Sequence, residues 1–239
     1  MQYNNSSELC KLMSEKTNGV SMLAFSCGKD AIASWVEMRK HFKTIIPIYY
    51  YTIPGLSFIE KSLKYYEDFF ETKIIRLPNP NFIRMLNNGV YQTPTNNKII
   101  KSFGFPPIKR EHLCEQVKID FNIDSSAYVA IGNRASDNLQ RQRSIYKRNP
   151  DGSIKEVKAV NDSNKTFYPV YDFNIADVVK SIREANVRLP HDYIMWGKTF
   201  DGLDYRFIKP IKDNYPDDYE KIKSYFPFID LEIIRYEQL

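Results

Sequence analysis

Short, continuous apolar runs alternate with amphipathic stretches in the first third of the chain. The runs at 20–25, 44–51 and 73–77 lack the polar–apolar alternation of half-exposed strands, so they predict strands buried on both faces. Between them, apolar residues recur at helical spacing over 31–41 and 59–70. This order of strands and helices predicts an α/β fold with a Rossmann-like, doubly wound and mostly parallel sheet.

The rest of the chain is less regular. A helix is expected over 111–121, a buried strand over 127–132 and a further helix over 174–186. A β-hairpin is predicted within 144–160, because Asn, Pro, Asp and Gly follow one another at its centre. The last fifty residues are rich in aromatic residues and proline, which predicts an irregular C-terminal extension.

Composition narrows the class of protein. The chain has 239 residues, of which 43% are hydrophobic, and this excludes disordered and collagen-like proteins. Its three cysteines, Cys10, Cys27 and Cys114, are not at CxxC spacing, so they support neither a disulfide framework nor a four-thiolate metal site. The polar N-terminus and the lack of any apolar run of about 18 residues predict a cytoplasmic protein without a membrane span.

The net charge of +5 is local. Residues 98–148 contain ten basic and five acidic side chains, while the remaining residues balance. A single positive segment favours a bound anion over a broad nucleic-acid surface, so direct nucleic-acid binding is not expected.

The residues that most clearly indicate a binding site lie where the first predicted strand meets the first predicted helix. They are Ala24-Phe25-Ser26-Cys27-Gly28-Lys29-Asp30-Ala31. A glycine permits a tight turn from strand to helix, and the amides and dipole at a helix N-terminus attract an anion. In open parallel sheets such loops lie at the carboxyl ends of the strands, where ligands bind. Lys29 adds a positive charge, and Asp30 suits either an Mg²⁺ ion or an anchor for the loop. A plain helix cap is the alternative for the same residues.

This loop resembles the PP-loop of the N-type ATP pyrophosphatase, or adenine nucleotide alpha hydrolase, superfamily, whose usual form is Ser-Gly-Gly-Lys-Asp-Ser. Cys27 stands at the first glycine position and Ala31 at the closing serine position. Two later segments resemble phosphoadenosine phosphosulfate reductases, namely Gly132-Asn133-Arg134 with Arg141 and Arg143, and Tyr168 to Phe173 with Asp177-Val178. The resemblance covers roughly residues 18 to 190, and the tail from Tyr193 to Pro227 resembles the phage-encoded and bacterial branch.

The resemblance implies an adenine-nucleotide site. Ala24 and Phe25 would lie near the adenine, Tyr50 and Tyr51 would flank the base or ribose, and the arginines would reach the anionic end. Lys29 and Asp30 are the expected catalytic residues, with Asp30 as the metal ligand. The full set expected to bind the nucleotide is Ala24, Phe25, Ser26, Cys27, Gly28, Lys29, Asp30, Tyr50, Tyr51, Gly132, Arg134, Arg141 and Arg143.

One part of the family pattern is missing. Sulfonucleotide reductases use a cysteine near their C-terminus, whereas this chain has no cysteine after Cys114, which argues against that reaction. Three scattered cysteines also argue against an iron–sulfur cluster. The expected cofactors are therefore ATP or a related adenine nucleotide and Mg²⁺, without an iron–sulfur cluster.

Three functions remain open on this basis. The resemblance favours an enzyme, an ATP pyrophosphatase or adenylyl transferase that activates an unknown acceptor substrate. The first alternative is a protein that reduces or binds a sulfonucleotide. The second is a non-catalytic, nucleotide-binding regulatory subunit that acts with a ParB-like partner protein.

The expected organisation has two parts. A PP-loop nucleotide-binding domain is expected over 1–190, with the hairpin near 144–160 as an insertion, and an extension over 191–239 is expected to pack on it. The aromatic residues of the extension predict a packed cap, with a lid over the nucleotide or a partner surface as alternatives.

Overall fold

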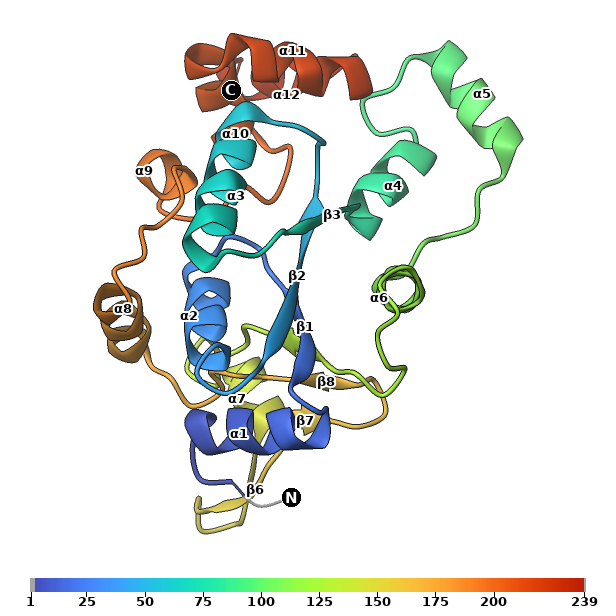
Figure 1. Cartoon of the computed structure of the whole chain (residues 1–239). Coiled ribbons are helices and arrows are strands. Elements are labelled where there is room, and N and C mark those ends of the chain that lie inside the picture. The colour runs from blue at the N-terminus through green and yellow to red at the C-terminus, as the bar shows by residue number, and fades with distance from the viewer. Residues whose placement is uncertain (1–2, 239) are drawn as a thin grey trace. The chain divides into compact units, whose positions relative to one another are not determined.

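A six-stranded, mostly parallel sheet runs through the chain in the order β3-β2-β1-β4-β8-β7 (Figure 1). The structure, a computed structural model, describes residues 3–238, so Met1 and Gln2 of the first expected domain and Leu239 of the extension lie outside it. The strands of this sheet are β1 (Val20–Ala24), β2 (Thr44–Tyr51), β3 (Ile75–Pro78), β4 (Val129–Ile131), β7 (Val160–Asn161) and β8 (Thr166–Phe167). Strands β5 (Tyr146–Arg148) and β6 (Ile154–Val157) form a separate antiparallel ribbon. The predicted Rossmann-like α/β fold and the hairpin are confirmed.

Helices flank the sheet and make up most of the C-terminal segment. They are α1 (Ser6–Lys16), α2 (Lys29–Met38), α3 (Ser57–Phe70), α4 (Pro80–Asn87), α5 (Pro94–Phe103), α6 (Arg110–Asp120), α7 (Leu139–Ile145), α8 (Ile175–Glu184), α9 (Asp192–Trp196), α10 (Tyr205–Asn214), α11 (Pro216–Tyr225) and α12 (Asp230–Glu237). The helices expected from the apolar spacing correspond to α2, α3, α6 and α8, whereas α1 was not expected. Within residues 3–238, no helix has the length and apolar character needed to cross a membrane.

Strand β1 lies between β2 and β4, and all three are parallel. In the sheet register, Ala24 at the end of β1 pairs with Ile48 of β2 and with Ile131 of β4. The chain proceeds outward from β1 to β2 and β3, and then returns to β4 on the other side of β1. The direction of winding therefore reverses between β1 and β4, and ligands of open α/β sheets bind at the carboxyl ends of strands at such a reversal.

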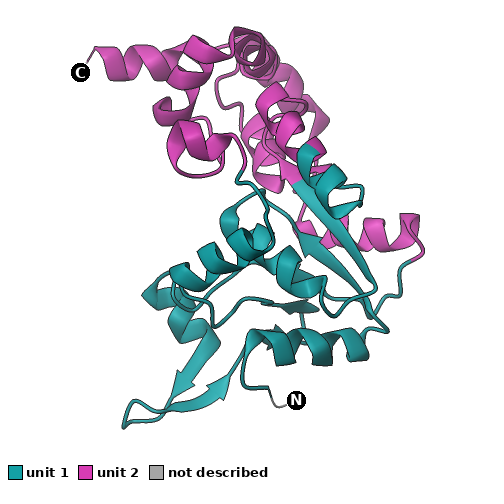
Figure 2. Cartoon of the chain, turned by 60° about the vertical axis from the view of Figure 1, so that its left-hand side comes forward, with its two compact units in different colours: residues 1–49, 65–75, 123–189 teal, residues 50–64, 76–122, 190–239 magenta. Residues whose placement is uncertain are grey.

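The chain divides into two compact units (Figure 2). Unit 1 comprises residues 1–49, 65–75 and 123–189, and unit 2 comprises residues 50–64, 76–122 and 190–239. The chain passes between the units several times, and its last passage from unit 1 to unit 2 is between Leu189 and Pro190. That residues 191–239 form an extension packed on 1–190 stays a prediction.

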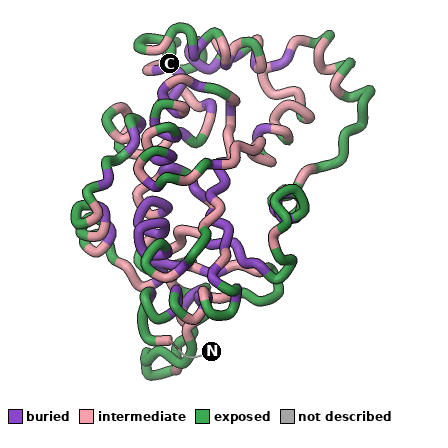
Figure 3. Tube along the Cα trace, viewed as in Figure 1, coloured by how far each residue is buried: buried purple, intermediate pink, exposed green. Residues whose placement is uncertain are grey.

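Helix α2 forms the centre of unit 1. Its residues from Ala31 to Met38 are all buried, and the buried colour follows this helix in Figure 3. Helices α1 and α8 both pack against it. The ring of Phe25, immediately after β1, meets the rings of Trp35 and Tyr66 edge-on, with centroid separations of 4.9 and 5.2 Å. The start of the loop after β1 is thereby held in the core.

The C-terminal part of unit 2 is helical, although its composition predicted an irregular segment. The ring of Phe58 on α3 lies 5.6 Å from the ring of Trp196 and 5.9 Å from that of Phe200, and both belong to an aromatic cluster. Asp218, which is buried, accepts hydrogen bonds from the backbone N–H and the hydroxyl of Ser57, at 2.8 and 2.7 Å. A carboxylate at the first residue of a helix is favourable because it faces the positive end of the helix dipole.

Candidate functional site

The loop predicted to be a PP-loop turns from β1 into α2 within four residues. The N–H of Phe25 donates to the carbonyl oxygen of Ile48 at 2.8 Å, so the sheet pairing continues one residue beyond β1. Cys27 then adopts φ 59°, in the left-handed region. Gly28 is the N-cap of α2, with φ −71° and ψ 153°, and its N–H donates to the Ser26 hydroxyl at 3.3 Å.

The backbone at Cys27 suits a glycine better than a side chain. A left-handed conformation costs an L-residue about 1–2 kcal/mol, and glycine avoids this cost. The usual PP-loop sequence has glycine at this position, which agrees with the backbone angle. The side chain of Cys27 is buried, so its packing offsets part of the conformational cost.

The N-terminus of α2 points out of the sheet at the reversal between β1 and β4. The first hydrogen bond within the helix runs from the Ile32 N–H to the Gly28 carbonyl oxygen at 3.0 Å. The N–H groups of Asp30 and Ala31 come before Ile32 and have no acceptor one helical turn earlier within the helix. Gly28, as the N-cap, has no side chain with which to bond to them. Backbone amides of this kind and the helix dipole together favour an anion.

Five charged side chains beside the loop alternate in sign. The Asp30 carboxylate accepts hydrogen bonds from the Lys29 ammonium at 3.1 Å and from Nε of Arg134 at 2.7 Å. Arg134 also donates to Asp137, and Asp137 accepts a second bond from Arg141. The chain of ion pairs begins and ends with a cation, and its formal charge is +1. Asp30 therefore anchors the loop to residues that follow β4.

Arg134 is buried and committed to several partners. Besides Asp30 and Asp137, it donates from Nη1 to the Ser136 hydroxyl at 2.7 Å and to the carbonyl oxygen of Phe173 at 3.4 Å. These bonds join the first turn of α2, the loop after β4 and the segment that leads to α8. The hydrogen bonds of Arg134 therefore hold the loop in position. Contact between Arg134 and a nucleotide stays a prediction.

Gly132 brings the loop after β4 against the start of α2. A Cβ atom at this position would lie 2.9 Å from the carbonyl carbon of Asp30 and 3.0 Å from the nitrogen of Ala31. These atoms belong to helix backbone, which cannot move aside as a flexible side chain can. Only glycine permits this approach, so Gly132 and the ion pair of Arg134 together set the position of the predicted phosphate loop.

A hollow of about 340 Å³ adjoins Lys29. Its other lining residues come from α8 and the segment after it, and they are mainly apolar: Val178, Val179, Ile182, Arg183, Asn186, Val187 and Leu189. The volume lies at the lower end of the range for small-molecule sites, which is about 300–1,000 Å³. The Lys29 side chain thus contacts the Asp30 carboxylate and also lines the mainly apolar hollow. One further cation, Arg183, lines the same hollow.

Several predicted site residues have other surroundings. The Phe25 side chain is in the core, where its ring contacts Trp35. Tyr50 and Tyr51 belong to unit 2. The Tyr50 hydroxyl lies 3.2 Å from the Cys114 sulfur, and burial raises the pKa of Tyr50 well above its usual range. Tyr51 meets the ring of Phe82 edge-on, with the centroids 6.1 Å apart.

The positive segment predicted over 98–148 is divided between the two units. Within unit 1, Arg134 and Arg141 join the chain of ion pairs at the loop. Arg143 is exposed and lines a different hollow, together with residues of the β5–β6 ribbon. The structure therefore brings together Ser26, Gly28, Lys29, Asp30, Gly132, Arg134 and Arg141 within unit 1.

The segment that resembles the reductases from Tyr168 onward has structural roles here. Asp177 accepts a hydrogen bond from the Asn174 N–H at 2.9 Å, and Asn174 accepts from the Asp177 N–H at 3.1 Å, which completes a capping box at α8. Asp172 accepts a hydrogen bond from the N–H of Ser6, the first residue of α1, at 3.2 Å, beside the N-cap Asn5. In this chain, Asp177 therefore serves the capping of α8.

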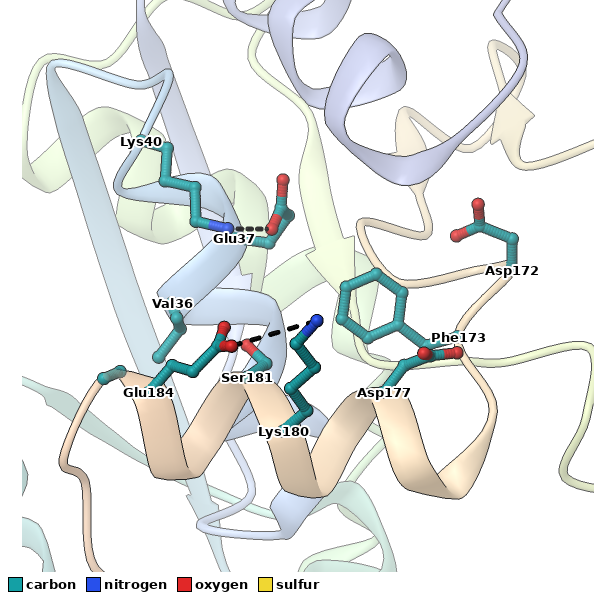
Figure 4. Close-up of a pocket in the computed structure, with 10 residues that line it drawn as sticks. Val36, Glu37, Lys40, Asp172, Phe173, Asp177, Lys180, Ser181 and Glu184 are labelled. Atoms are coloured by element: carbon teal, nitrogen blue, oxygen red, sulfur yellow. Dashed lines mark hydrogen bonds and ion pairs between the residues drawn. The ribbon is translucent and has the colours of Figure 1, made fainter.

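A further hollow of about 530 Å³ lies between α2 and α8, away from the loop (Figure 4). Glu37 of α2 pairs with Lys40, which follows the helix, at 2.6 Å, and Lys180 and Glu184 of α8 pair at 3.9 Å. The two acidic and two basic side chains compensate one another in charge.

Sequence reasoning missed two parts of the site. Asp137, which links Arg134 to Arg141, had a usable signal, because it lies three residues after one arginine and four before the other. The apolar residues of α8 beside Lys29 gave no signal of a binding site in the sequence, because apolar residues at helical spacing ordinarily indicate core packing.

No family model matches the chain, and no curated protein sequence matches it significantly. Solved structures that are similar to it include the following three. The U34-tRNA thiolase NcsA from Methanococcus maripaludis, solved with its 4Fe–4S cluster, is 15% identical, with a TM-score of 0.47 over 94% of this chain and 79% of that one. The phosphoadenylyl-sulfate reductase from Candida auris, a phosphate complex, is 11% identical, with a TM-score of 0.48 over 83% and 88%. The NH3-dependent NAD synthetase from Campylobacter jejuni, in complex with nitrate, is 10% identical, with a TM-score of 0.43 over 96% and 92%.

These likenesses are too weak to transfer a ligand or an activity. One neighbour is a reductase of the class that the sequence resembles, but every identity is at most 15% and every TM-score is below 0.5. Membership of the phage-encoded branch and a ParB-like partner stay predictions.

The cofactor prediction is wrong as stated. It combined an adenine nucleotide with Mg²⁺ at Asp30 and excluded an iron–sulfur cluster, yet a structural neighbour carries such a cluster. Among residues 3–238, no group of three or more His, Cys, Asp or Glu side chains could hold a metal ion. The Asp30 carboxylate is engaged by Lys29 and Arg134, so its surroundings do not fit a Mg²⁺ ligand.

Proposed function

We propose that the loop from Ser26 to Asp30 binds the phosphates of an adenine nucleotide, and that the protein cleaves ATP to transfer its adenylyl group to an acceptor. One observation carries the proposal: the N-terminus of α2, with Lys29 in its first turn, lies at the reversal of winding between β1 and β4. This is the position at which α/β sheets bind ligands, and it combines helix amides with a full positive charge.

The reaction would be a displacement at the α-phosphorus. An acceptor oxygen attacks that phosphorus, the bond from it to the bridging oxygen breaks, and pyrophosphate leaves with the bonding electrons. Negative charge develops on the phosphate oxygens, and the Lys29 ammonium and the helix amides are positioned to stabilise it. No protein nucleophile takes part, which agrees with the lack of a cysteine after Cys114.

Asp30 and Arg134 act as positioning residues in this proposal. Their ion pair at 2.7 Å and the close approach of Gly132 keep the first turn of α2 in place, so the amides need no reorganisation when the nucleotide binds. The apolar hollow beside Lys29 offers a surface for the less polar part of the nucleotide or for the acceptor.

Nucleotide binding is tested by calorimetric titration of ATP into the wild-type protein and the Lys29→Ala variant. Loss of one charge-assisted contact is expected to weaken ATP binding about tenfold or more. Lys11→Ala removes an exposed lysine on α1 and serves as the matched control, with unchanged affinity expected. Equal ATP affinity in wild type and Lys29→Ala would refute the phosphate role of the loop.

Turnover is tested by measuring pyrophosphate and AMP release from ATP in the presence of cell extract as a source of acceptor. The proposal requires release that the Lys29→Ala variant reduces. Stronger thermal stabilisation by adenosine 3′,5′-bisphosphate than by ATP would instead favour the sulfonucleotide alternative. Nucleotide binding without pyrophosphate release would instead favour the alternative of a non-catalytic regulatory subunit.

A further inference from the structure

The root of the β5–β6 ribbon carries a hollow that is separate from the phosphate loop. It has a volume of about 590 Å³ and lies between α7 and the ribbon. Four cationic side chains line it, together with Tyr146 and the exposed Leu139: Arg143, Lys147, Arg148 and Lys155. We refer to these four cations as the ribbon cluster.

The charge of this region is concentrated and poorly compensated. Residues 139–158 contain six basic and two acidic side chains, and one of the six, Arg141, pairs with Asp137 beside the loop. Of the two acidic residues, Glu156 pairs with Lys147 at 3.2 Å, and Asp151 accepts hydrogen bonds from Ser153 at the tip of the ribbon. Because few acids face the ribbon cluster, the hollow has a positive potential.

An irregularity in the ribbon gathers the cations around one hollow. Lys147 pairs with Glu156, but Arg148 pairs with Ile154, so Lys155 is an extra residue on its strand. In a regular strand successive side chains point to opposite faces, whereas a bulge redirects a side chain. The register shift accounts for the presence of Lys147, Arg148 and Lys155 in the lining of the same hollow.

A neighbouring lysine adds to the crowding of positive charge. Lys158 is exposed, and contact with the ammonium of Lys147 lowers the pKa of Lys158 below its usual value. Like charges held this close repel each other, and a bound anion relieves the repulsion. The four cations around one hollow indicate a polyanionic ligand.

We infer that the ribbon cluster binds the phosphodiester backbone of a nucleic-acid strand. A concave hollow accommodates a strand between α7 and the ribbon, whereas a bilayer surface requires a flat or convex face. Tyr146 and Gln142 are half-buried but line the hollow, where the Tyr146 ring can contact a base and the Gln142 amide can form hydrogen bonds beside the phosphates. This differs from the expectation from sequence, which located the charge over 98–148 and argued against nucleic acid. The inference does not depend on nucleotide binding at the loop.

The test measures binding of the full chain to fluorescent 20-nucleotide single strands of DNA and RNA by anisotropy, over a series of salt concentrations. The double variant Lys147→Gln/Lys155→Gln removes two exposed cations of the ribbon cluster. Its affinity is expected to fall about tenfold, and its salt dependence should decrease by about 0.7 in log–log slope for each lysine. Lys147→Arg/Lys155→Arg should retain the wild-type affinity, and thermal melting verifies that each variant is folded.

The matched control is Lys61→Gln/Lys180→Gln, which removes the same charge from exposed positions on α3 and α8. A loss in this control equal to that in the cluster variant would show a general charge effect and overturn the inference. So would unchanged binding in the cluster variant, or binding of heparin or of phosphatidylserine vesicles in preference to both nucleic acids. Preference for RNA or for DNA would support the inference and identify the kind of strand.

Discussion

Arg134, which follows β4, donates a hydrogen bond from Nε to Oδ1 of Asp30 in the first turn of α2, at a distance of 2.7 Å. The guanidinium is almost fully buried, with 6% of the side chain exposed, and the carboxylate is 21% exposed. Arg134 also pairs with Asp137, so removal of the guanidinium leaves two carboxylates near each other without their shared cation.

Substitution of Arg134 by Gln is therefore expected to lower the free energy of unfolding by about 3 kcal/mol. Urea denaturation followed by circular dichroism measures the change. Arg143→Gln provides a control on an exposed arginine, for which a change within about 0.5 kcal/mol is expected. Equal effects of the two substitutions would contradict the bracing role of Arg134.

Gly132→Ala tests the close approach between the loop after β4 and α2. The new methyl group would meet helix backbone at 2.9–3.0 Å, so we expect a loss of about 1–3 kcal/mol in stability and weaker ATP binding. Gly202→Ala is the matched control, because its Cβ would meet only a side-chain oxygen of Asp204 at 3.5 Å. Thermal melting with and without ATP distinguishes them, and tolerance of alanine at Gly132 would count against the proposed packing.

Cys27→Gly and Cys27→Ala separate backbone conformation from side-chain packing. Both remove the sulfur, but only glycine relieves the left-handed backbone at φ 59°. We expect the glycine variant to be more stable than the alanine variant by about 1 kcal/mol. Parallel urea titrations compare the two proteins. An alanine variant as stable as the glycine variant would show that this conformation carries no cost.

Asp192 predicts a pH dependence of stability in unit 2. Its Oδ2 accepts a hydrogen bond from the Phe200 N–H at 2.9 Å, whereas Oδ1 is buried without a hydrogen-bond partner among the described residues. Burial raises the pKa of Asp192 above its ordinary value. A raised pKa means that the fold favours the protonated acid, so this contribution is full below about pH 3.8 and is lost as the pH rises through the raised pKa.

Asp192→Asn keeps the acceptor for Phe200 and removes the ionisation, so this decline with rising pH should disappear. At pH 7 we expect the variant to gain on the order of 1 kcal/mol. Thermal melting from pH 4 to 8 measures both effects. A variant whose stability follows the same pH profile as the wild type would refute the assignment.

The contribution of Asp230 to stability should depend on pH in the opposite direction to that of Asp192. Hydrogen bonds from Lys223, Tyr219 and Lys212, at 2.8, 2.6 and 2.9 Å, hold the pKa of its carboxyl well below its usual range. Its contribution is present above the unfolded-state pKa and is lost as the pH falls through the lowered value. Asp230→Asn should therefore destabilise the protein at pH 7, and the difference from wild type should shrink on acidification. Melting curves over the same pH series provide the comparison.

Local signals in the sequence were sufficient where neighbouring residues determine the structure. The apolar run over 44–51 coincides with β2, because a strand buried on both faces needs apolar residues throughout. The helix expected over 174–186 corresponds to α8, and Asn174 is its N-cap, because capping involves only residues two and three positions away. The helix α1 was missed, because its buried Leu9, Cys10 and Met13 are too few among polar residues to give a clear pattern.

The sequence by itself determined the α/β class, the strand–loop–helix junction at residues 24–31 and the ribbon near its turn, since these depend on composition and spacing along the chain. Only the tertiary structure decided that Asp30 is an anchor held by Arg134, that Gly132 touches α2, and that Lys155 joins Arg143, Lys147 and Arg148. The partners of Asp30 and Gly132 lie about a hundred positions away along the chain, so sheet register and helix packing bring them together. The position of the Lys155 side chain depends instead on a one-residue shift in strand pairing. Such a shift turns a side chain to the other face of the strand and cannot be predicted from composition.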